Sequence, residues 1–412
     1  MPNHYSFYLP KGKKIKVMLV VENFDKGGLE QVVYDLAMGL KQGARIQPII
    51  LVVNRAGWFA HRARTVGIEV IELPRPFDQH AYWEIIQEFL PDLINSHGIC
   101  FGAKLGAKHG IPFIQTIHNT YVWLSPSKIN EYREMEKYTA VYVCVSRNVA
   151  KYSDLKLKLD PGLMRIVPNG IDIKRFNFSA AKIQFLREQL RGQFNLNRED
   201  FVFLCTSAFY RHKGQLEAIE ALHYALRLYP RLKMLFVGAN ADPTYYEEVL
   251  QTVGRLRLRD RVIFAGFQED PVGFYYAADA FIQPSYWEGW SLALAEALYA
   301  GLPVVVTDVG AARDLLADGG LGILVAPPFQ DITQLDSSNW SLYLTGECGD
   351  RSNFVARLAE AMLRCAQAKW PESERMRSQQ LIRDKYSVER MVSDYERLYF
   401  EVVTAPKICF VG

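Results

Sequence analysis

The sequence Ala280-Phe-Ile-Gln-Pro-Ser-Tyr-Trp-Glu-Gly-Trp-Ser-Leu-Ala-Leu-Ala-Glu-Ala-Leu-Tyr-Ala-Gly-Leu-Pro-Val-Val-Val306 contains a predicted strand, a helix and a second strand in succession. The first apolar run ends at Ile282, and a turn with one proline and one glycine follows it. Ser291 is well placed to cap a helix, which is predicted to stop at Gly301. A strand, a helix and a strand in this order form a right-handed crossover, so the segment predicts two parallel strands of one sheet.

The same alternation of short apolar runs and longer amphipathic stretches extends from this segment in both directions. It restarts after Pro168-Asn-Gly170, a strong turn signal, and therefore forms two series. Strands that alternate with helices predict an α/β protein, here with two Rossmann-like lobes joined near residue 172. The predicted strands are residues 16–21, 47–53, 93–94, 112–117 and 140–145 in the first series, and 201–205, 233–237, 262–264, 280–282, 303–306 and 322–325 in the second.

This pattern predicts four segments along the chain. Residues 1–172 and 173–385 form the two lobes. Residues 386–404 contain an amphipathic helix that packs back on the first lobe. Residues 405–412 are a tail that reads either as an added edge strand or as the start of a further segment. Residues 327–351 break the pattern and are expected to form an inserted loop or a small excursion from the fold.

The composition is typical of a globular protein, because 49% of the 412 residues are hydrophobic and 23% are charged. No apolar run approaches the roughly 18 residues needed to cross a bilayer. The start, from Met1 to Lys14, lacks the apolar stretch of a secretory signal. The six cysteines are scattered without a C-x-x-C pair, which favours buried reduced thiols over a zinc or disulfide framework. We therefore expect a cytoplasmic protein.

The formal net charge of +3 is unevenly distributed. Residues 1–178 carry an excess of Lys and Arg, and the remainder carries an excess of Asp and Glu. A basic N-terminal half suits an acidic acceptor or peripheral contact with the anionic inner face of a membrane. Ordinary solvated surface is the alternative. Nucleic acid is not expected as a partner.

The predicted helix after Ser291 has the elements of an anion site. Backbone amides at the start of a helix lack partners within the helix, so they suit a diphosphate. Glu288 precedes the helix and Glu296 lies in its second turn, so one carboxylate would reach a sugar and the other a ribose. Carboxylates suit both tasks because each accepts several hydroxyl hydrogen bonds. Taken alone, these residues are also compatible with two surface glutamates on an Ala/Leu-rich helix.

Glu288 and Glu296, with seven residues between them, resemble the signature of the retaining GT-B glycosyltransferases of glycosyltransferase family 4. The resemblance covers most of the chain and its order of motifs. The further matching motifs are Gly27-Gly-Leu-Glu30, Val167-Pro-Asn-Gly-Ile-Asp172, Lys213-Gly214, Val262-Ile-Phe-Ala-Gly266, Ala278-Asp279 and Tyr386-Ser-Val-Glu-Arg-Met391. It implies two Rossmann-like β/α/β domains that face an interdomain cleft, with residues 1–172 binding the acceptor and residues 173–385 binding the nucleotide sugar.

The resemblance also implies roles for individual residues. Three catalytic residues follow from it: His118, Lys213, which would neutralise the departing diphosphate, and Glu288, which would hold the sugar hydroxyls. Gly28 would let the first loop approach the donor closely. The donor-binding residues implied are Gly27, Gly28, Arg211, Lys213, Gly266, Phe267, Glu288, Gly289, Trp290, Ser291, Leu292 and Glu296, and Glu30 and Asn119 lie on the acceptor side.

The chain departs from the family pattern at a few positions. The family usually has an arginine five residues before the lysine, as a second cation on the diphosphate, and this chain has Ala208 there. Arg211 or His212 would have to replace it. The loss of one charge-assisted contact costs about 1.5–3 kcal/mol if nothing does. Ser291 stands where many relatives have glycine, and Asp314 stands where a glutamate is common.

We therefore predict transfer of a hexose or N-acetylhexosamine from a nucleoside diphosphate sugar to a hydroxyl acceptor, in cell-surface glycan biosynthesis. The resemblance implies retention of configuration, and a lipid-linked glycan is one candidate acceptor. No cofactor is expected, and no Asp-x-Asp triplet or histidine cluster predicts a metal site. The alternatives are a sugar-nucleotide hydrolase or epimerase on the same fold, and a non-catalytic sugar-nucleotide binder.

Overall fold

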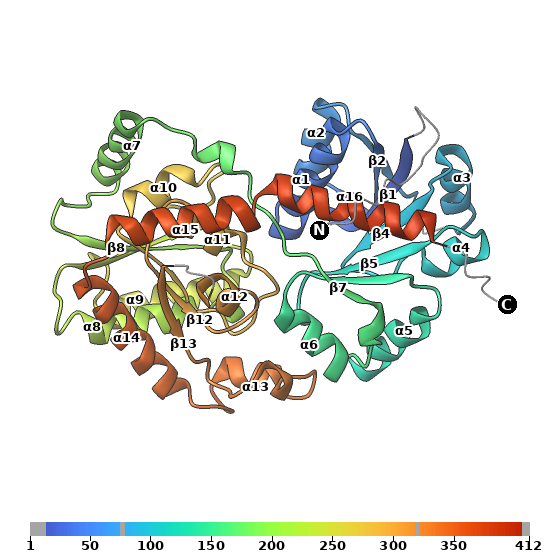
Figure 1. The fold of residues 1–412 in the computed structure, drawn as a ribbon. Helices are drawn as coiled ribbons and strands as arrows, with labels where there is room; N and C mark the ends of the chain where they lie inside the picture. The colour runs from blue at the N-terminus through green and yellow to red at the C-terminus, as the bar shows by residue number, and fades with distance from the viewer. Residues whose placement is uncertain (1–13, 75–78, 318–320, 406–412) are drawn as a thin grey trace. The chain divides into compact units, whose positions relative to one another are not determined.

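The computed structural model describes residues 14–74, 79–317 and 321–405. The chain divides into two compact units, each described by itself (Figure 1). Unit 1 comprises Met1–Thr120, Leu124–Gly170 and Val388–Gly412, and unit 2 comprises Tyr121–Trp123 and Ile171–Ser387. The edge strand considered for the tail after residue 405 lies outside the described residues, as does most of the start of the chain.

Unit 1 is built on a seven-stranded sheet in which every strand pair is parallel. The strand order is β3-β2-β1-β4-β5-β6-β7, so the order reverses between β1 and β4. Five of these strands were predicted from the sequence, and the short β3 and β7 were not. The strands are β1 (Ile15–Phe24), β2 (Ile46–Ala56), β3 (Glu69–Glu72), β4 (Leu93–His97), β5 (Phe113–Ile117), β6 (Val141–Cys144) and β7 (Met164–Ile166).

Six α-helices of the first 170 residues and the last helix of the chain accompany this sheet in the described part of unit 1. They are α1 (Gly28–Gln42), α2 (Trp58–Thr65), α3 (Gln79–Phe89), α4 (Ala103–Lys108), α5 (Pro126–Glu136), α6 (Arg147–Leu155) and α16 (Val388–Thr404), with the short 3-10 helix η1 (Pro161–Leu163).

The last helix, α16, packs against α1 and the sheet (Figure 1). The Val392 side chain lies so close to Gly39 that a Cβ at Gly39 would meet it at 2.3 Å. Two tyrosines of the same helix reach the sheet through their hydroxyl groups. Tyr399 donates to Asn95 Oδ1 at 2.6 Å, and the Tyr395 hydroxyl lies 3.3 Å from the Thr116 hydroxyl. The helix is therefore a part of the unit 1 core.

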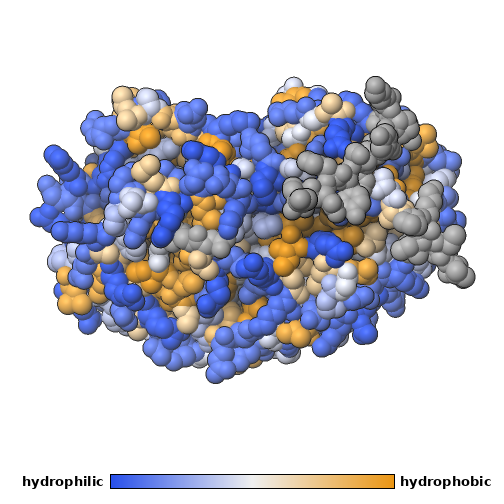
Figure 2. All heavy atoms as spheres, viewed as in Figure 1, coloured by the Kyte–Doolittle hydropathy of each residue, from blue (hydrophilic) through white to orange (hydrophobic). Residues whose placement is uncertain are grey.

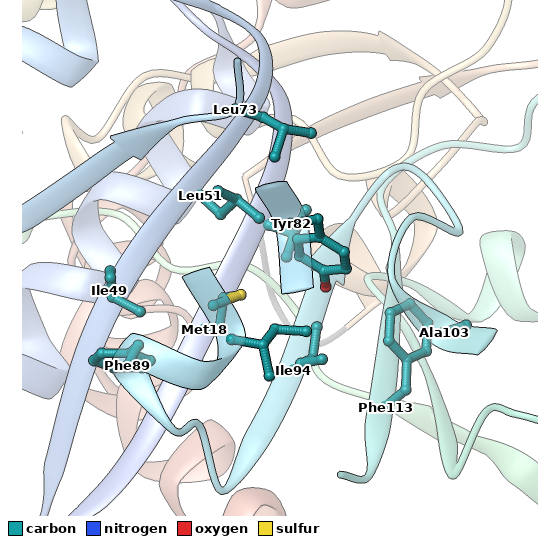
Figure 3. Packing of buried hydrophobic residues seen from close by; sticks show 11 residues of the cluster. Met18, Ile49, Leu51, Leu73, Tyr82, Phe89, Ile94, Ala103 and Phe113 are labelled. Atoms are coloured by element: carbon teal, nitrogen blue, oxygen red, sulfur yellow. The ribbon is translucent and has the colours of Figure 1, made fainter. Parts of the chain in front are cut away.

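One apolar core cluster of unit 1 lies between β1, β2, β4 and β5 on one side and α3 on the other (Figure 3). Met18 and Ile49 come from the central strands, and Tyr82 and Phe89 come from α3; all four side chains are buried. Burial of one such side chain stabilises the folded state by about 1.5–3 kcal/mol. This packing fixes the strand ends whose loops are described below.

Unit 2 is built on a six-stranded parallel sheet, and the sequence analysis predicted all six strands. The order β10-β9-β8-β11-β12-β13 reverses between β8 and β11. The prediction of two Rossmann-like α/β domains is therefore confirmed. The strands are β8 (Phe201–Thr206), β9 (Leu232–Val237), β10 (Val262–Phe264), β11 (Ala280–Gln283), β12 (Val304–Thr307) and β13 (Gly322–Val325).

The helices of unit 2 alternate with these strands, and α15 packs alongside α11 (Figure 1). They are η2 (Ile173–Phe176), α7 (Ala180–Gln193), η3 (Arg211–Lys213), α8 (Gln215–Ala225), α9 (Pro243–Arg255), α10 (Val272–Ala277), α11 (Leu292–Tyr299), α12 (Ala312–Ala317), η4 (Ile332–Gln334), α13 (Trp340–Thr345), α14 (Arg351–Gln367) and α15 (Glu372–Lys385). The stretch at 327–351, expected as an inserted loop or a small excursion, contains the short helices η4 and α13. The Asp331 carboxylate caps the first of these by accepting from Thr333 N at 3.0 Å.

Figure 2 shows hydrophilic residues over most of the visible face, with hydrophobic residues between them. No helix among the described residues is long and apolar enough to cross a bilayer. The five described cysteines are all free thiols. Cys144, Cys205 and Cys365 are buried as expected, whereas Cys100 and Cys348 are partly exposed. Cys409 lies outside the described residues.

Candidate active site

The loops after β8 and β11 meet in unit 2 because these two strands are neighbours at the point where the strand order reverses. Ligands of doubly wound sheets bind at this point, at the carboxyl ends of the strands. The loop after β8 carries Lys213, and the loop after β11 carries Glu288. A main-chain hydrogen bond of 2.8 Å from Tyr286 N to His212 O joins the two loops.

Glu288 is held by one cation and one hydroxyl group. Lys213 Nζ and Ser285 Oγ each lie 2.8 Å from Glu288 Oε1. The glutamate is 8% exposed, so little water screens this ion pair. Two residues that the resemblance marks as catalytic are thus in direct contact. Ser285 stands three residues before Glu288 in the sequence, and no role was predicted for it.

Two glycines allow the backbone to come close enough for this contact. Gly214 follows Lys213 at φ +71°, and a Cβ there would lie 2.2 Å from the Pro284 carbonyl oxygen. Gly310 has φ +57°, and a Cβ there would lie 2.9 Å from Glu288 Cβ and from the Gly289 carbonyl oxygen. Any larger residue at either position would separate the segments that hold Glu288.

The Ser291 cap predicted from the sequence is present. Its hydroxyl accepts from Leu294 N at 3.2 Å and donates to Gln283 Oε1 at 2.5 Å. It therefore ties the start of α11 to the end of β11. Leu292 is the first residue of α11, and Trp290 is buried with its ring 5.8 Å from that of Tyr386.

Glu296 is also buried, and it has two partners that the sequence analysis missed. Arg175 Nη1 lies 2.9 Å from Glu296 Oε1, and the Tyr275 hydroxyl donates to Oε2 at 2.7 Å. A second nitrogen of Arg175 pairs with Asp270 at 2.7 Å. Burial raises the pKa of the Glu296 carboxyl, and Arg175 and Tyr275 oppose that rise. Arg175 stands three residues after the Asn-Gly-Ile-Asp motif, which was the signal available in the sequence.

Arg211 and His212 were considered as replacements for an arginine at position 208. The two side chains have different surroundings in the structure. The Arg211 guanidinium pairs with Glu248 of α9 and lies 5.1 Å from the centre of the Tyr245 ring. The His212 ring stacks on Trp287 at 5.2 Å, and burial together with Lys213 lowers the pKa of His212 to about 3. His212 is therefore neutral at physiological pH and supplies no second positive charge.

The loop that carries Glu288 rests on a buried ionic network. The Tyr286 hydroxyl donates to Glu217 Oε1 at 3.0 Å, and Arg351 Nε lies 2.7 Å from the same oxygen. Arg351 also pairs with Glu220 at 2.8 Å. Glu217 and Glu220 belong to α8 and Arg351 to α14, so two helices anchor the loop.

The remaining donor residues predicted in unit 2 lie in the loop after β10. Gly266 has φ +69°, a Cβ there would meet nothing within 4 Å, and its carbonyl accepts from Gly238 N at 2.9 Å. The neighbouring Phe267 is 45% exposed. Asp314 lies in the first turn of α12.

In unit 1, Gly27 and Gly28 stand at the start of α1, directly after β1. The Glu30 carboxylate folds back over Gly27, where a Cβ would lie 2.1 Å from Glu30 Oε2. The close contact at Gly27 is therefore with a side chain of the same turn, and the approach of Gly28 to a donor stays a prediction. Burial raises the pKa of Glu30.

His118 follows β5 and pairs with a second histidine at the end of β4. His118 Nε2 and His97 Nδ1 are 2.9 Å apart. Burial lowers the pKa of His118 to about 3 and lowers that of His97 well below its usual range. Both rings are therefore neutral, so one donates and the other accepts. Asn119 Oδ1 accepts from Thr120 N at 2.8 Å.

His97 was not predicted as a site residue. Its position after an apolar strand was the only signal, and such a histidine is usually structural. No group of three or more His, Cys, Asp or Glu residues within the described ranges has the geometry of a metal site.

Two family models match the chain. Glycosyltransferase Family 4 matches residues 26–175, and Glycosyl transferases group 1 matches residues 187–340. The first range lies almost entirely in unit 1 and the second in unit 2. Both glutamates of the signature lie in the second range.

Curated relatives carry the same assignment. The UDP-Gal:alpha-D-GlcNAc-diphosphoundecaprenol alpha-1,3-galactosyltransferase of Escherichia coli is 25% identical over 59% of this chain and 64% of its own length. The chain therefore spans less than two thirds of that relative. The N-acetyl-alpha-D-glucosaminyl L-malate synthase of Bacillus anthracis is 24% identical over 76% of this chain and 74% of its own length.

Among solved structures, Anabaena HepE in complex with UDP and glucose superposes with a TM-score of 0.69. It is 19% identical, and the match covers 93% of this chain and 99% of HepE. At this identity the likeness shows the fold alone. With both family models matched in order, the chain belongs to the glycosyl transferases of group 1 that carry a glycosyltransferase family 4 domain, a family with the GT-B fold.

Proposed function

We propose that this chain is a retaining glycosyltransferase that moves a hexose or N-acetylhexosamine from a nucleoside diphosphate sugar to a hydroxyl group. The contact between Lys213 and Glu288 carries the proposal. It joins a cation suited to a diphosphate and a carboxylate suited to sugar hydroxyls in one buried position at the strand-order reversal.

In this proposal, unit 2 binds the donor. Backbone amides at the start of α11, around Ser291 and Leu292, bind the phosphates. Lys213 stabilises the negative charge that develops on the leaving diphosphate. Glu288 orients the sugar and Glu296 the ribose, each with an oxygen able to accept further hydrogen bonds.

We propose that the sugar departs and the acceptor attacks on the same face, because no carboxylate was identified as a covalent nucleophile. Lys213 then supplies positive charge that a metal supplies in other transferases. EDTA is expected to leave the transfer rate unchanged, and a rate that falls with EDTA and returns with Mg²⁺ or Mn²⁺ would contradict this part of the proposal.

For the acceptor, we propose a lipid-linked glycan. The names of two relatives support this choice: the Escherichia coli galactosyltransferase acts on a diphosphoundecaprenol-linked sugar, and a Xanthomonas campestris enzyme is named for a diphosphopolyprenol-linked acceptor. The excess of basic residues in the first 178 residues suits peripheral contact with an anionic membrane. Co-sedimentation with vesicles that contain or lack anionic lipid tests this contact.

The reaction is tested by incubating the protein with UDP-, GDP- and ADP-sugars and acceptors, with mass spectrometry of the products. Transfer to an acceptor is expected, together with its loss in Glu288→Ala. Release of free sugar whatever acceptor is present would indicate a hydrolase. Tight binding without turnover would indicate a non-catalytic binder.

A further inference from the structure

A pocket lies in unit 2 at the C-terminal end of α11, whereas the proposed donor site uses the N-terminal end of that helix. Its volume is about 590 Å³, within the range of small-molecule sites. Segments η2, α10, α11 and α15 contribute to its lining. The residues used below are Lys174, Phe176, Tyr276, Tyr299, Arg375 and Arg383.

Two guanidinium groups of the pocket hydrogen-bond to uncharged oxygens. Arg375 Nη1 donates to the Gly301 carbonyl at 2.7 Å, and Arg383 Nη2 lies 3.4 Å from the Tyr299 hydroxyl. Neither forms an ion pair with a residue in the described part of the chain, whereas the partly buried Arg175 and Arg351 each pair with two carboxylates. With Lys174, the pocket holds three cationic side chains against one acidic residue, Glu372. Such a surface attracts an anion.

Three aromatic side chains of the pocket lining pack against one another and form an aromatic wall. The Phe176 ring meets Tyr299 at 5.4 Å and Tyr276 at 6.3 Å, both edge to face. The Tyr276 hydroxyl donates to the Phe176 carbonyl at 3.1 Å, which holds η2 against α10. An aromatic wall of this kind suits a flat ring.

We propose that this pocket binds an organic phosphate that carries a flat ring. The phosphate pairs with Arg375 and Arg383, and the ring packs on the wall formed by Phe176, Tyr276 and Tyr299. Guanidinium groups favour phosphate because their paired N–H donors match its oxygens. The site is separate from Lys213 and Glu288, neither of which lines it.

The pocket is connected to Glu296 through the short helix η2. Lys174 and Phe176 line the pocket, and Arg175 between them pairs with Glu296. A ligand that shifts η2 therefore changes the position of the Glu296 partner. Occupancy of the pocket is expected to change nucleotide affinity; this clause alone rests on the proposed function.

Direct binding of phenyl phosphate, measured by calorimetry, tests the site. We expect saturable binding to the wild-type chain and at least a tenfold loss in Arg375→Gln/Arg383→Gln. Arg377→Gln is the matched control, because it removes the same charge from an exposed position of α15 that does not line the pocket. Thermal unfolding checks that each variant is folded, and Phe176→Leu, which keeps all charges, is a second test of the aromatic wall.

Three outcomes would overturn the site: equal binding by the double variant, equal loss in Arg377→Gln, or loss in Lys213→Ala, which would place phenyl phosphate in the donor site. Inorganic phosphate is expected to bind more weakly than phenyl phosphate. Equal affinity would contradict the proposed binding of a ring by the aromatic wall.

The coupling is tested by titrating UDP with and without saturating phenyl phosphate. A change of at least threefold in UDP affinity, abolished in the double variant, is expected. Unchanged UDP affinity would contradict the coupling between the two sites but not the phosphate-binding pocket itself. Absence of UDP binding under all conditions would count against UDP as the nucleotide of the donor site, while the phenyl phosphate titration would still decide the pocket.

Discussion

Glu288 and Glu296 lie at the two ends of one short segment, and each is held by one cation and one hydroxyl group, yet their cations differ. Lys213 comes from the loop after the neighbouring strand and pairs with Glu288 alone among the described residues. Arg175 comes from η2 and is shared between Glu296 and Asp270. Lysine presents three donors on a flexible stem, whereas arginine holds two acceptors in a fixed plane.

This difference indicates that Lys213 can contact a ligand as well as Glu288, whereas Arg175 serves to orient Glu296. Lys213 has donors to spare for a phosphate oxygen while it contacts Glu288. Arg175 is already paired with two carboxylates, so its role is to orient Glu296 rather than to bind a ligand. We therefore expect changes at the Glu288 end to affect the chemical step, and changes at the Glu296 end to affect nucleotide affinity and stability.

Removal of the lysine has the largest expected effect. Lys213→Ala is expected to lower kcat about 100- to 1,000-fold, because one preorganised charge that acts on the transition state is worth about that factor. Steady-state kinetics with the donor from the panel measures it. Lys182→Ala, at an exposed position of α7, is the control and should retain full activity. A Lys213→Ala enzyme with unchanged kcat and raised KM would mean that the lysine only binds the donor.

Gly214 is expected to tolerate no side chain. Gly214→Ala forces a Cβ to within 2.2 Å of the Pro284 carbonyl and is expected to destabilise the fold by about 2–3 kcal/mol. Gly266→Ala is the matched control, because its φ of +69° is similar but nothing lies within 4 Å of a Cβ there. That variant should lose only about 1 kcal/mol, from backbone strain. Urea unfolding compares the two, and equal losses would show that close approach at Gly214 is unimportant.

Arg175→Ala is expected to weaken nucleotide binding about tenfold and to destabilise the fold by about 1–3 kcal/mol, since it leaves a buried carboxylate with one partner. Burial already holds the pKa of Glu296 above its usual value of 4.5. A carboxyl with a raised folded-state pKa loses stability as the pH rises through that value. Without Arg175 the pKa rises further.

The stability deficit of Arg175→Ala should therefore be larger at pH 8 than near pH 4.5, where Glu296 is protonated. Thermal unfolding at both pH values measures this difference. Arg175→Lys should recover part of the stability. A deficit that does not depend on pH would show that the guanidinium acts by packing rather than by charge.

The two hydroxyl groups are expected to have the smallest effects. Ser285→Ala and Tyr275→Phe each remove one hydrogen bond to a carboxylate but leave its cation in place, so each is expected to cost about 1.5 kcal/mol, the low end for bonds to a charged group. The first should lower kcat several-fold with little change in nucleotide affinity, and the second should do the reverse. If both variants changed the same kinetic parameter, the proposed division between the two glutamates would be wrong.

Local patterns were sufficient for most of the fold. All six strands of unit 2 and the Ser291 cap were predicted, because apolar β-branched runs and a serine before a helix have local physical causes. The prediction missed β3, which has four residues with a glutamate at each end, and β7, which has three. Strands this short lack a pattern of their own, and their pairing with β2 and β6 defines them.

The site was predicted less completely than the fold. Lys213 and Glu288 were identified through the resemblance to a family, and their contact spans 75 residues of sequence. The pair of Arg175 and Glu296 spans 121 residues, and nothing near either residue indicates the other. The same holds for His97 and His118, which meet because β4 and β5 are neighbours in the sheet.

Residue order alone therefore specified the alternation of strands and helices, the helix cap and the candidate residues, since these depend on interactions between residues close in the chain. The tertiary structure alone set three further features. They are the partners of the two glutamates, the neutral state of His212 and the contact of Arg211 with Glu248. Each of these features depends on burial or on contacts between segments distant in the chain. The strand order brings those segments together, and the sequence of no single segment specifies that order.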